Sequence, residues 1–342
     1  MPSLLGRTVQ TAKFLAADPV LTAKTGQTPH EIVFRMGKSA LRFFPADPEV
    51  EARRPVLISM PLINTWTIFD LLPGRSVVAK LTAAGIPVYL VDWGRPGEED
   101  EARELSYYID DVLGRMFDRA RRHASKHYDT TELDAIGYCV GGTFLSVHLA
   151  RNPEQAIRSA FVATPIDFHS SERLARWANP ESFPLDTLID SVGNYPADLM
   201  RTSFAWLKPS GQTAKWVGLW ERIDQDGFPE LWAALEQWSG DNVDFPGEAY
   251  REYVQRCYFD NALMTGGWVL GTQAVDLSKA KTPALVISAS RDHIAPPAAC
   301  GGLEKAWGAP CEVKTIRGGH VGICVGSTLA ATLIEWFTQP EA

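Results

Sequence analysis

The feature that most constrains the fold of this 342-residue chain is a short apolar run, residues 133–136, that leads directly into Gly137–Gly142 (GYCVGG). Helix-like sequence follows at once, so the pattern predicts a strand that reverses into a helix within about one residue. The residue at such a turn is strained, and glycines two positions before and after it remove side chains that would collide there. We therefore expect Cys139 to project from the end of a sheet.

A cysteine at this position has two interpretations. The backbone N–H groups of a helix N-terminus carry partial positive charge, which favours both a thiolate and an oxyanion, so Cys139 is a candidate nucleophile. The alternative is a small buried hydrophobe, which is the commoner role of a free cysteine. Gly322–Gly326 (GICVG) repeats the pattern, but no residues remain downstream to supply an acid and a base. We expect Cys324 to be a packed structural residue.

We call the predicted turn at Cys139 the elbow. Strands and helices alternate along the sequence before and after it. We expect one or two edge strands in residues 31–44, buried strands in 56–60 and 85–94, and further strands in 159–164, 282–288 and 312–316. This rhythm predicts an α/β-hydrolase fold, with a mostly parallel central sheet flanked by helices. The expected organisation is an N-terminal lead-in over 1–50, a catalytic core over 51–164 and 262–342, and a helical lid inserted over 165–261.

The inserted segment, residues 165–261, holds six of the eleven tryptophans of the chain. Such rings pack in cores, and that interpretation accounts for most of them. They are also suited to line an apolar substrate channel beneath a lid.

The order of candidate catalytic residues is nucleophile, then acid, then histidine, which is the order of α/β-hydrolases. Asp292 follows a late predicted strand, and His320 follows the last one. We expect His320 to remove the proton of Cys139 and Asp292 to orient and stabilise the imidazolium. The N–H groups of Val140 and Ile63 are the candidate oxyanion donors.

Two further expectations concern binding groups near this triad. His293, next to the acid, either holds its loop or lines the substrate entrance. Phosphate groups have no Gly-rich loop to bind, and Arg95 is only one of several basic candidates near the sheet ends.

Cysteine in place of serine narrows the reaction. A thiol that attacks a thioester exchanges one thioester for another at nearly equal energy, so the acyl group stays activated for transfer to an alcohol. Acyl transfer from a thioester is therefore favoured, and hydrolysis of activated esters is the competing reaction.

Composition excludes several other classes. The formal charge of −8 and the absence of a basic stripe argue against nucleic-acid binding. No apolar run approaches the roughly 20 residues of a membrane span, and the N-terminus lacks the apolar stretch of a signal peptide. The five cysteines resemble neither a disulfide framework nor a zinc site, which fits a reducing cytoplasm. We expect no cofactor and no metal.

These motifs together resemble the polyhydroxyalkanoate synthases, which polymerise (R)-3-hydroxyacyl-CoA. Residues 137–142 are similar to the lipase-like box of that family, 290–297 to its acid segment and 318–322 to its Gly-Gly-His segment. Further similar segments lie between residues 50 and 335. The resemblance implies that Cys139 takes the acyl group from CoA, and that the 3-hydroxyl of a second unit then attacks with help from Asp292 or His320.

The length resembles the class III or class IV catalytic subunits of these synthases. That resemblance implies a second, non-catalytic subunit, a homodimer and work at the surface of cytoplasmic polymer granules. A cysteine-dependent hydrolase, either an intracellular polymer depolymerase or a thioesterase, is the alternative with the same triad. A granule-associated binding protein without turnover is a third. The sequence leaves open the preferred acyl length.

Overall fold

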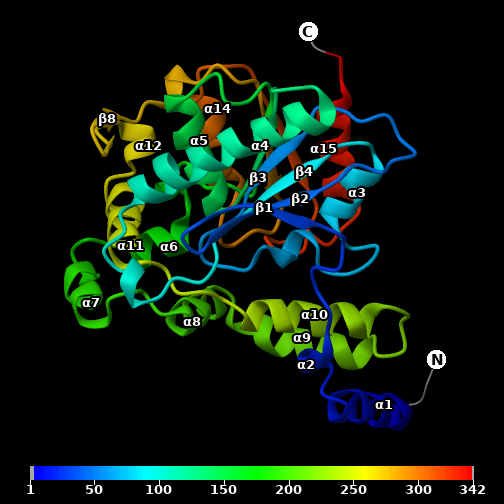
Figure 1. Ribbon diagram of the computed structural model, residues 1–342. Helices are drawn as coiled ribbons and strands as arrows, with labels where there is room; N and C mark the ends of the chain where they lie inside the picture. The colour runs from blue at the N-terminus through cyan, green and yellow to red at the C-terminus, as the bar shows by residue number, and fades with distance from the viewer. Residues whose placement is uncertain (1–3, 341–342) are drawn as a thin grey trace.

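The computed structural model describes residues 4–340, and an eight-stranded sheet forms its centre (Figure 1). The strand order is β1-β2-β4-β3-β5-β6-β9-β10. β2 runs antiparallel to both neighbours, and the other neighbouring pairs from β4 to β10 are parallel. This mostly parallel sheet confirms the predicted fold class. The strands are β1 Glu31–Met36, β2 Ser39–Phe44, β3 Val56–Ser59, β4 Val88–Asp92, β5 Asp134–Tyr138, β6 Ser159–Val162, β9 Ala284–Ala289 and β10 Cys311–Ile316.

The central strands are short apolar runs because both faces of the sheet are covered. Every residue of β3, β5, β6 and β9 is buried, as expected where helices cover a parallel sheet. Helix α4 (Leu113–Tyr128) crosses in front of the strands in Figure 1 and packs against α5 (Val140–Arg151). Helices α3 (Val77–Ala83) and α15 (Thr328–Thr338) pack against each other. The core therefore lies between the sheet and these helices.

Residues 107–126 have apolar positions at helical spacing, and the helix there begins as a π-helix, Tyr107–Val112, before α4 starts. A π-turn shifts the register by one residue, which apolar spacing does not reveal. The buried ring of His148 lies over this turn, with Nδ1 2.9 Å from the carbonyl oxygen of Ile109. The ring also stacks on Phe117 with centroids 5.2 Å apart. Burial lowers the pKa of His148 to about 4.

Because the pKa of His148 is lowered in the folded protein, we expect the free energy of unfolding to fall in acid. Its unfolded pKa is near 6.5, so between about pH 6.5 and pH 4 the unfolded chain binds a proton that the folded chain does not. Stability therefore falls as the pH drops through this window. An asparagine keeps a donor for Ile109 and removes the titration. Relative to His148→Asn, the native protein should lose about 3 kcal/mol between pH 7 and pH 4. Urea unfolding at both values checks this, and parallel pH dependences of the two proteins would contradict it.

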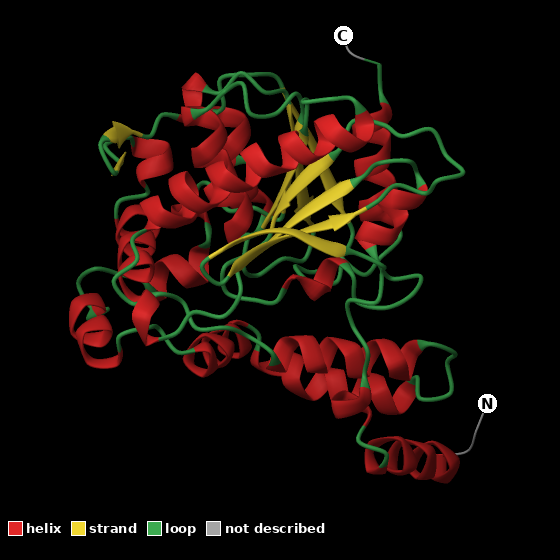
Figure 2. Cartoon of the chain, in the orientation of Figure 1, coloured by secondary structure: helices red, strands yellow, loops and turns green. Residues whose placement is uncertain are grey.

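The segment over 165–261 is helical, and its helices α8 to α10 lie below the sheet in Figures 1 and 2. We refer to residues 165–261 as the cap. Its helices are α6 Glu172–Trp177, α7 Leu185–Val192, α8 Ala197–Leu207, α9 Pro209–Glu221, α10 Phe228–Gly240 and α11 Gly247–Tyr253, followed by the π-helix Val254–Phe259. A small two-stranded sheet, β7 Val269–Leu270 and β8 Gln273–Ala274, comes after the cap.

The first 50 residues contribute to two different parts of the molecule. Helices α1 (Leu4–Ala16) and α2 (Pro19–Thr22) pack against α9 and α10 of the cap, where Phe14 contacts a cluster that includes Trp232. Residues 31–44 instead form β1 and β2, which extend the central sheet. β2 pairs with β1 and β4, and most of its side chains are buried. Within residues 4–340, no helix combines the length and the apolar character needed to cross a bilayer.

Candidate active site

Cys139 sits at the sharp turn between β5 and α5. Its backbone has φ 52° and ψ −132°, a conformation that side chains rarely adopt. Gly141 and Gly142 are required because other parts of the chain approach their Cα atoms too closely to leave room for a side chain. A Cβ on Gly141 would lie 2.2 Å from the Met60 carbonyl oxygen, and one on Gly142 would lie 2.0 Å from Thr164 Oγ1. The turn thus forms only with glycine at these positions, and it holds Cys139 at the end of the strand.

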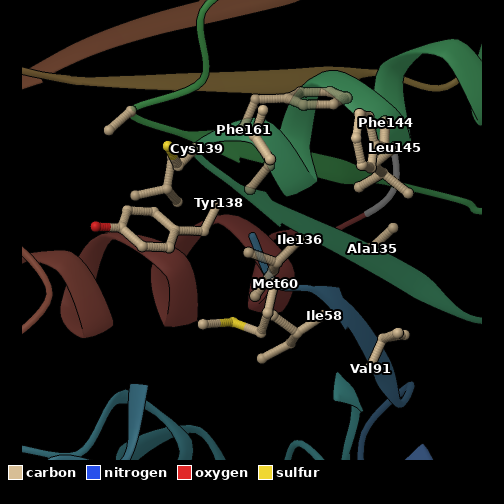
Figure 3. Close-up of a cluster of buried hydrophobic side chains, with 14 of the residues drawn as sticks. Ile58, Met60, Val91, Ala135, Ile136, Tyr138, Cys139, Phe144, Leu145 and Phe161 are labelled. Atoms are coloured by element: carbon tan, nitrogen blue, oxygen red, sulfur yellow. The ribbon is translucent and has the colours of Figure 1, made fainter. Parts of the chain in front are cut away.

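Cys139 is 7% exposed, and Figure 3 shows it with Tyr138 among the buried side chains of β3 to β6 and α5. Its N–H donates to the Val162 carbonyl at 3.0 Å, which ties the turn to the neighbouring strand β6. The sulfur is therefore placed by a rigid backbone rather than by a mobile loop.

The structure brings the predicted acid and base together. His320 Nδ1 lies 2.7 Å from Asp292 Oδ2. The other carboxylate oxygen of Asp292 accepts hydrogen bonds from the N–H groups of Ile294 at 2.8 Å and Ala295 at 2.9 Å. The carboxylate is thus held through both oxygens, and it fixes the ring with Nε2 free to face Cys139. A catalytic histidine needs a carboxylate that holds its ring in this way through Nδ1.

The electrostatics of His320 favour its charged form. Burial opposes the charge, but the neighbouring Cys139 sulfur and the Asp292 carboxylate, which is hydrogen-bonded to the ring, raise the pKa of His320 above its ordinary value. An imidazolium beside Cys139 would stabilise the thiolate, which is the nucleophilic form of cysteine. The pair is suited to attack a carbonyl carbon.

Tyr138 is a site residue that the sequence reasoning did not single out. Its ring centroid lies 5.4 Å from that of His320, and its hydroxyl donates to the His320 carbonyl at 3.5 Å. Burial, with Cys324 and Cys139 nearby, raises the pKa of Tyr138 well above its ordinary value. Its position directly before Cys139 was the available signal. Tyr138 therefore packs against the loop that carries His320.

The two predicted oxyanion donors come from different elements and line one cavity with Cys139. Val140 is the first residue of α5, so its N–H has no acceptor within the helix. Ile63 belongs to residues 61–65, which we call the oxyanion loop, directly after β3. Both residues line the same cavity as Cys139. Val140 and Ile63 thus remain the candidate donors for a tetrahedral oxyanion at Cys139.

Two cavities meet at Cys139. The first, of about 140 Å³, is lined mainly by apolar and aromatic cap residues, including Trp177, Phe183, Met200, Tyr253 and Tyr258. The second, of about 230 Å³, is more polar and is lined by Asn64, Arg201, Ser239, Asn242 and His320 among others. Cys139, Ile63, Phe204 and Ile294 line both. The nucleophile is therefore reached from one apolar and one polar side.

The structure does not bring His293 to these cavities. Its side chain is exposed, and the next residue, Ile294, lines both cavities instead. The backbone turn at Asp292 directs Ile294 inward, where its N–H also bonds the acid. Cys324 is buried in a loop of turns without the positive φ of Cys139. It lies 4.0 Å from the His320 carbonyl oxygen and forms no elbow.

The cap tryptophans divide between core, cavity and surface. Trp232 and Trp238 are buried, and Trp238 and Trp177 line cavities. Trp206 is 69% exposed and Trp216 is 47% exposed. Only part of the aromatic content of the cap thus serves the site.

Known proteins share this fold. The family model described as alpha/beta hydrolase fold matches residues 71–327, which include all three residues of the candidate triad. Among solved structures, Est816, titled an N-acyl homoserine lactone degrading enzyme, has a TM-score of 0.52 at 13% identity and covers 90% of this chain and 100% of its own. A likeness at that identity supports the fold alone.

Sequence relatives define the family. The Poly(3-hydroxyalkanoate) polymerase subunit PhaC of Allochromatium vinosum is 32% identical over 306 residues, which cover 88% of this chain and 84% of the relative. This chain belongs to the poly(3-hydroxyalkanoate) polymerase family. The PhaC polymerase subunit of Haloferax mediterranei is 30% identical over 332 residues. That match covers 94% of this chain but 66% of the relative, so the chain spans about two thirds of its length.

Proposed function

We propose that this polymerase-family chain is a catalytic subunit that polymerises (R)-3-hydroxyacyl-CoA into polyester and releases CoA. The observation that carries the proposal is the position of Cys139, a thiol at a strained elbow where an apolar and a polar cavity meet. The hydrogen-bonded Asp292–His320 pair supports it, because this pair can accept and return the proton of the thiol.

The proposed reaction has two transfers. The Cys139 thiolate attacks the thioester carbonyl, the oxyanion receives hydrogen bonds from Val140 and Ile63, and the carbon–sulfur bond to CoA breaks. The CoA thiolate takes the proton held by His320 and leaves. The 3-hydroxyl of a second acyl unit then attacks the acyl-Cys139 carbonyl, loses its proton to His320 or Asp292 and forms the ester as the Cys139 sulfur departs. No cofactor or metal ion is needed for either transfer.

The shape of the site favours acyl transfer over hydrolysis. On the side of the apolar cavity, the cap covers Cys139 with side chains such as Phe183, so water has few polar groups to bind along that path. A hydroxyacyl chain is better solvated there than water is. The competing function, a cysteine-dependent depolymerase or thioesterase, uses the same triad and differs only in which oxygen reaches the acyl-enzyme.

The test is to supply the purified chain with (R)-3-hydroxybutyryl-CoA and measure free CoA together with the mass of the acyl product. We expect CoA release with high-mass polyester. Release of CoA with only free 3-hydroxybutyrate would overturn the proposal in favour of a hydrolase. The reaction is run with and without a candidate second subunit, because activity only in its presence would identify a two-subunit enzyme.

We expect Phe204 of α8 to take part in selecting acyl length, because its side chain lines both cavities. Phe204→Ala enlarges the space beside Cys139, and one methylene in an apolar pocket changes discrimination by roughly 10-fold or more. We expect the ratio of kcat/KM for 3-hydroxyhexanoyl-CoA over 3-hydroxybutyryl-CoA to rise about 10-fold. Trp206→Ala, on the same helix but 69% exposed, is the matched control. An unchanged ratio in Phe204→Ala would assign acyl selection to other residues.

The same proposal covers partners and location. A second non-catalytic subunit, a homodimer and action at polymer granules in the cytoplasm are proposed, and the word "subunit" in the names of the PhaC relatives supports the first of these. Exposed apolar side chains on α1 and α8 support contact with an apolar surface, namely Leu4 at 71%, Leu5 at 74% and Trp206 at 69% exposed. The net charge of −8 supports a partner other than nucleic acid.

A further inference from the structure

The oxyanion loop is tied to the cap at three consecutive residues. The N–H of Val243 donates to the Ile63 carbonyl at 3.2 Å. Two residues further along the loop, the indole N–H of Trp238 donates to the Thr65 carbonyl at 2.9 Å. The backbone that carries one candidate oxyanion donor is thus held by the end of α10 and by the segment that follows it.

The middle residue of the loop makes the most specific contact. The side-chain amide of Asn64 donates to the side-chain oxygen of Asn242, and the two residues also form an isolated antiparallel bridge. Both asparagines line the polar cavity, together with Cys139 and His320. They therefore connect the cap to the cavity that Cys139 and His320 line.

The two candidate oxyanion donors differ in what holds them. Val140 opens α5, a helix buried from Val140 to Ala150, so its N–H is fixed by the core alone. On the core side, the oxyanion loop is held at its start, where the indole N–H of Trp93 donates to the Met60 carbonyl at 2.6 Å. Beyond that point the described contacts of Ile63 to Thr65 with the cap set the direction of the Ile63 peptide.

We propose that Asn242 is a positioning residue through which the cap completes the oxyanion hole. The inference rests on the proposed acyl transfer at Cys139. Ile63 has only two soft backbone torsions, and its carbonyl and the following residue are both held by the cap. Its N–H is therefore aimed at the oxyanion while the cap is seated. When the cap lifts, these three contacts are lost together.

This coupling has a chemical consequence. A thioester that reaches Cys139 under an open cap meets one fixed donor, Val140, and reacts slowly. Seating the cap adds the second donor and also excludes water. Acylation is thereby confined to the enclosed site, where the acyl-enzyme is protected from hydrolysis.

The test uses Asn242→Ala and follows acylation of Cys139 in a single turnover with (R)-3-hydroxybutyryl-CoA, read by intact mass. Loss of one oxyanion donor costs about 10²- to 10³-fold in other enzymes. Misplacement of the donor should lower the acylation rate about 10-fold or more, with KM changed less than about 2-fold. Alkylation of Cys139 by iodoacetamide forms no oxyanion, so its rate should stay unchanged.

Two further variants make the result specific. Asn242→Asp keeps an oxygen that accepts the hydrogen bond from Asn64, and it should restore most of the acylation rate. Asp241→Asn removes the neighbouring, exposed ion pair with Arg95, which does not involve the oxyanion loop, and should leave acylation at the native rate. Equal losses of acylation and alkylation in Asn242→Ala would show a general collapse of the site and overturn the inference, as would native acylation in that variant.

Acylation also separates this inference from the proposed function. The step is common to a polymerase and a hydrolase. A native chain that acylates Cys139 but makes no polyester would refute the polymerase proposal and still allow the Asn242 comparison. A native chain that is never acylated would refute both.

Discussion

Replacing Cys139 with alanine is expected to lower CoA release from (R)-3-hydroxybutyryl-CoA by at least about four orders of magnitude. The sulfur is the atom that must carry the acyl group, and no other described side chain occupies the elbow position. Alanine keeps the Cβ, so the strained turn and the flanking glycine contacts should remain. The measurement is CoA release, with intact mass to show that no acyl adduct forms and circular dichroism to show that the fold persists.

Two other cysteines sharpen this test. Cys311→Ala, on β10 and half-buried, is the control and should keep native turnover. Cys324 lies in the repeated Gly-x-Cys-x-Gly pattern and is the residue that would replace Cys139 if the assignment were wrong. Native turnover in Cys139→Ala together with loss of turnover in Cys324→Ala would move the nucleophile to Cys324.

The second large effect is expected for Asp292→Asn, which should lower kcat about 10³- to 10⁴-fold. The carboxylate accepts two backbone hydrogen bonds and holds His320 Nδ1 at 2.7 Å. An amide of the same shape keeps the packing, removes the negative charge and presents either a donor or a weaker acceptor to the ring. The imidazole then loses its fixed tautomer and its stabilised charged form.

Asp292→Asn also removes a negative charge beside His320, and this loss sets the direction in which the pKa of His320 changes. Asp292 is one of the two neighbours that raise the pKa of His320, so the pKa should fall toward its ordinary value in Asp292→Asn. An NMR titration of the His320 ring measures this fall alongside kcat. Asp226→Asn, at an exposed position between α9 and α10, is the control and should change neither quantity. A native kcat in Asp292→Asn would remove Asp292 from the proposed mechanism.

Most of the sheet could be predicted from the sequence because its strands are local patterns. The buried strands β3 to β6 and β9 are short runs rich in apolar residues with turn residues at their ends, whereas β10 is mostly half-buried or exposed. The elbow motif is likewise local, because its glycines and cysteine lie within residues 137–142, although Met60 and Thr164, which follow other strands, are what leave no room for side chains at Gly141 and Gly142. What apolar spacing did not reveal was the π-helix Tyr107–Val112, which differs from an α-helix by one residue of register.

The structure brings predicted site residues close together where the sheet itself supplies the geometry. Asp292 and His320 follow neighbouring parallel strands, so their meeting at one edge is a consequence of topology. His293 had the same sequence signal but faces away from the cavities, because adjacent loop residues point in different directions. Tyr138 was missed because its contact with His320 spans 182 positions of sequence.

The sequence by itself determined the fold class, the strained position of Cys139 and the order of the candidate triad, because these depend on residues close together in the chain or on the order of strands. Only the tertiary structure decided the two cavities at Cys139 and the hold of the cap on the oxyanion loop. The Asn64–Asn242 contact joins residues 178 positions apart. Whether such side chains meet depends on how the cap helices pack, and cap packing is a sum of many weak contacts that no local pattern records.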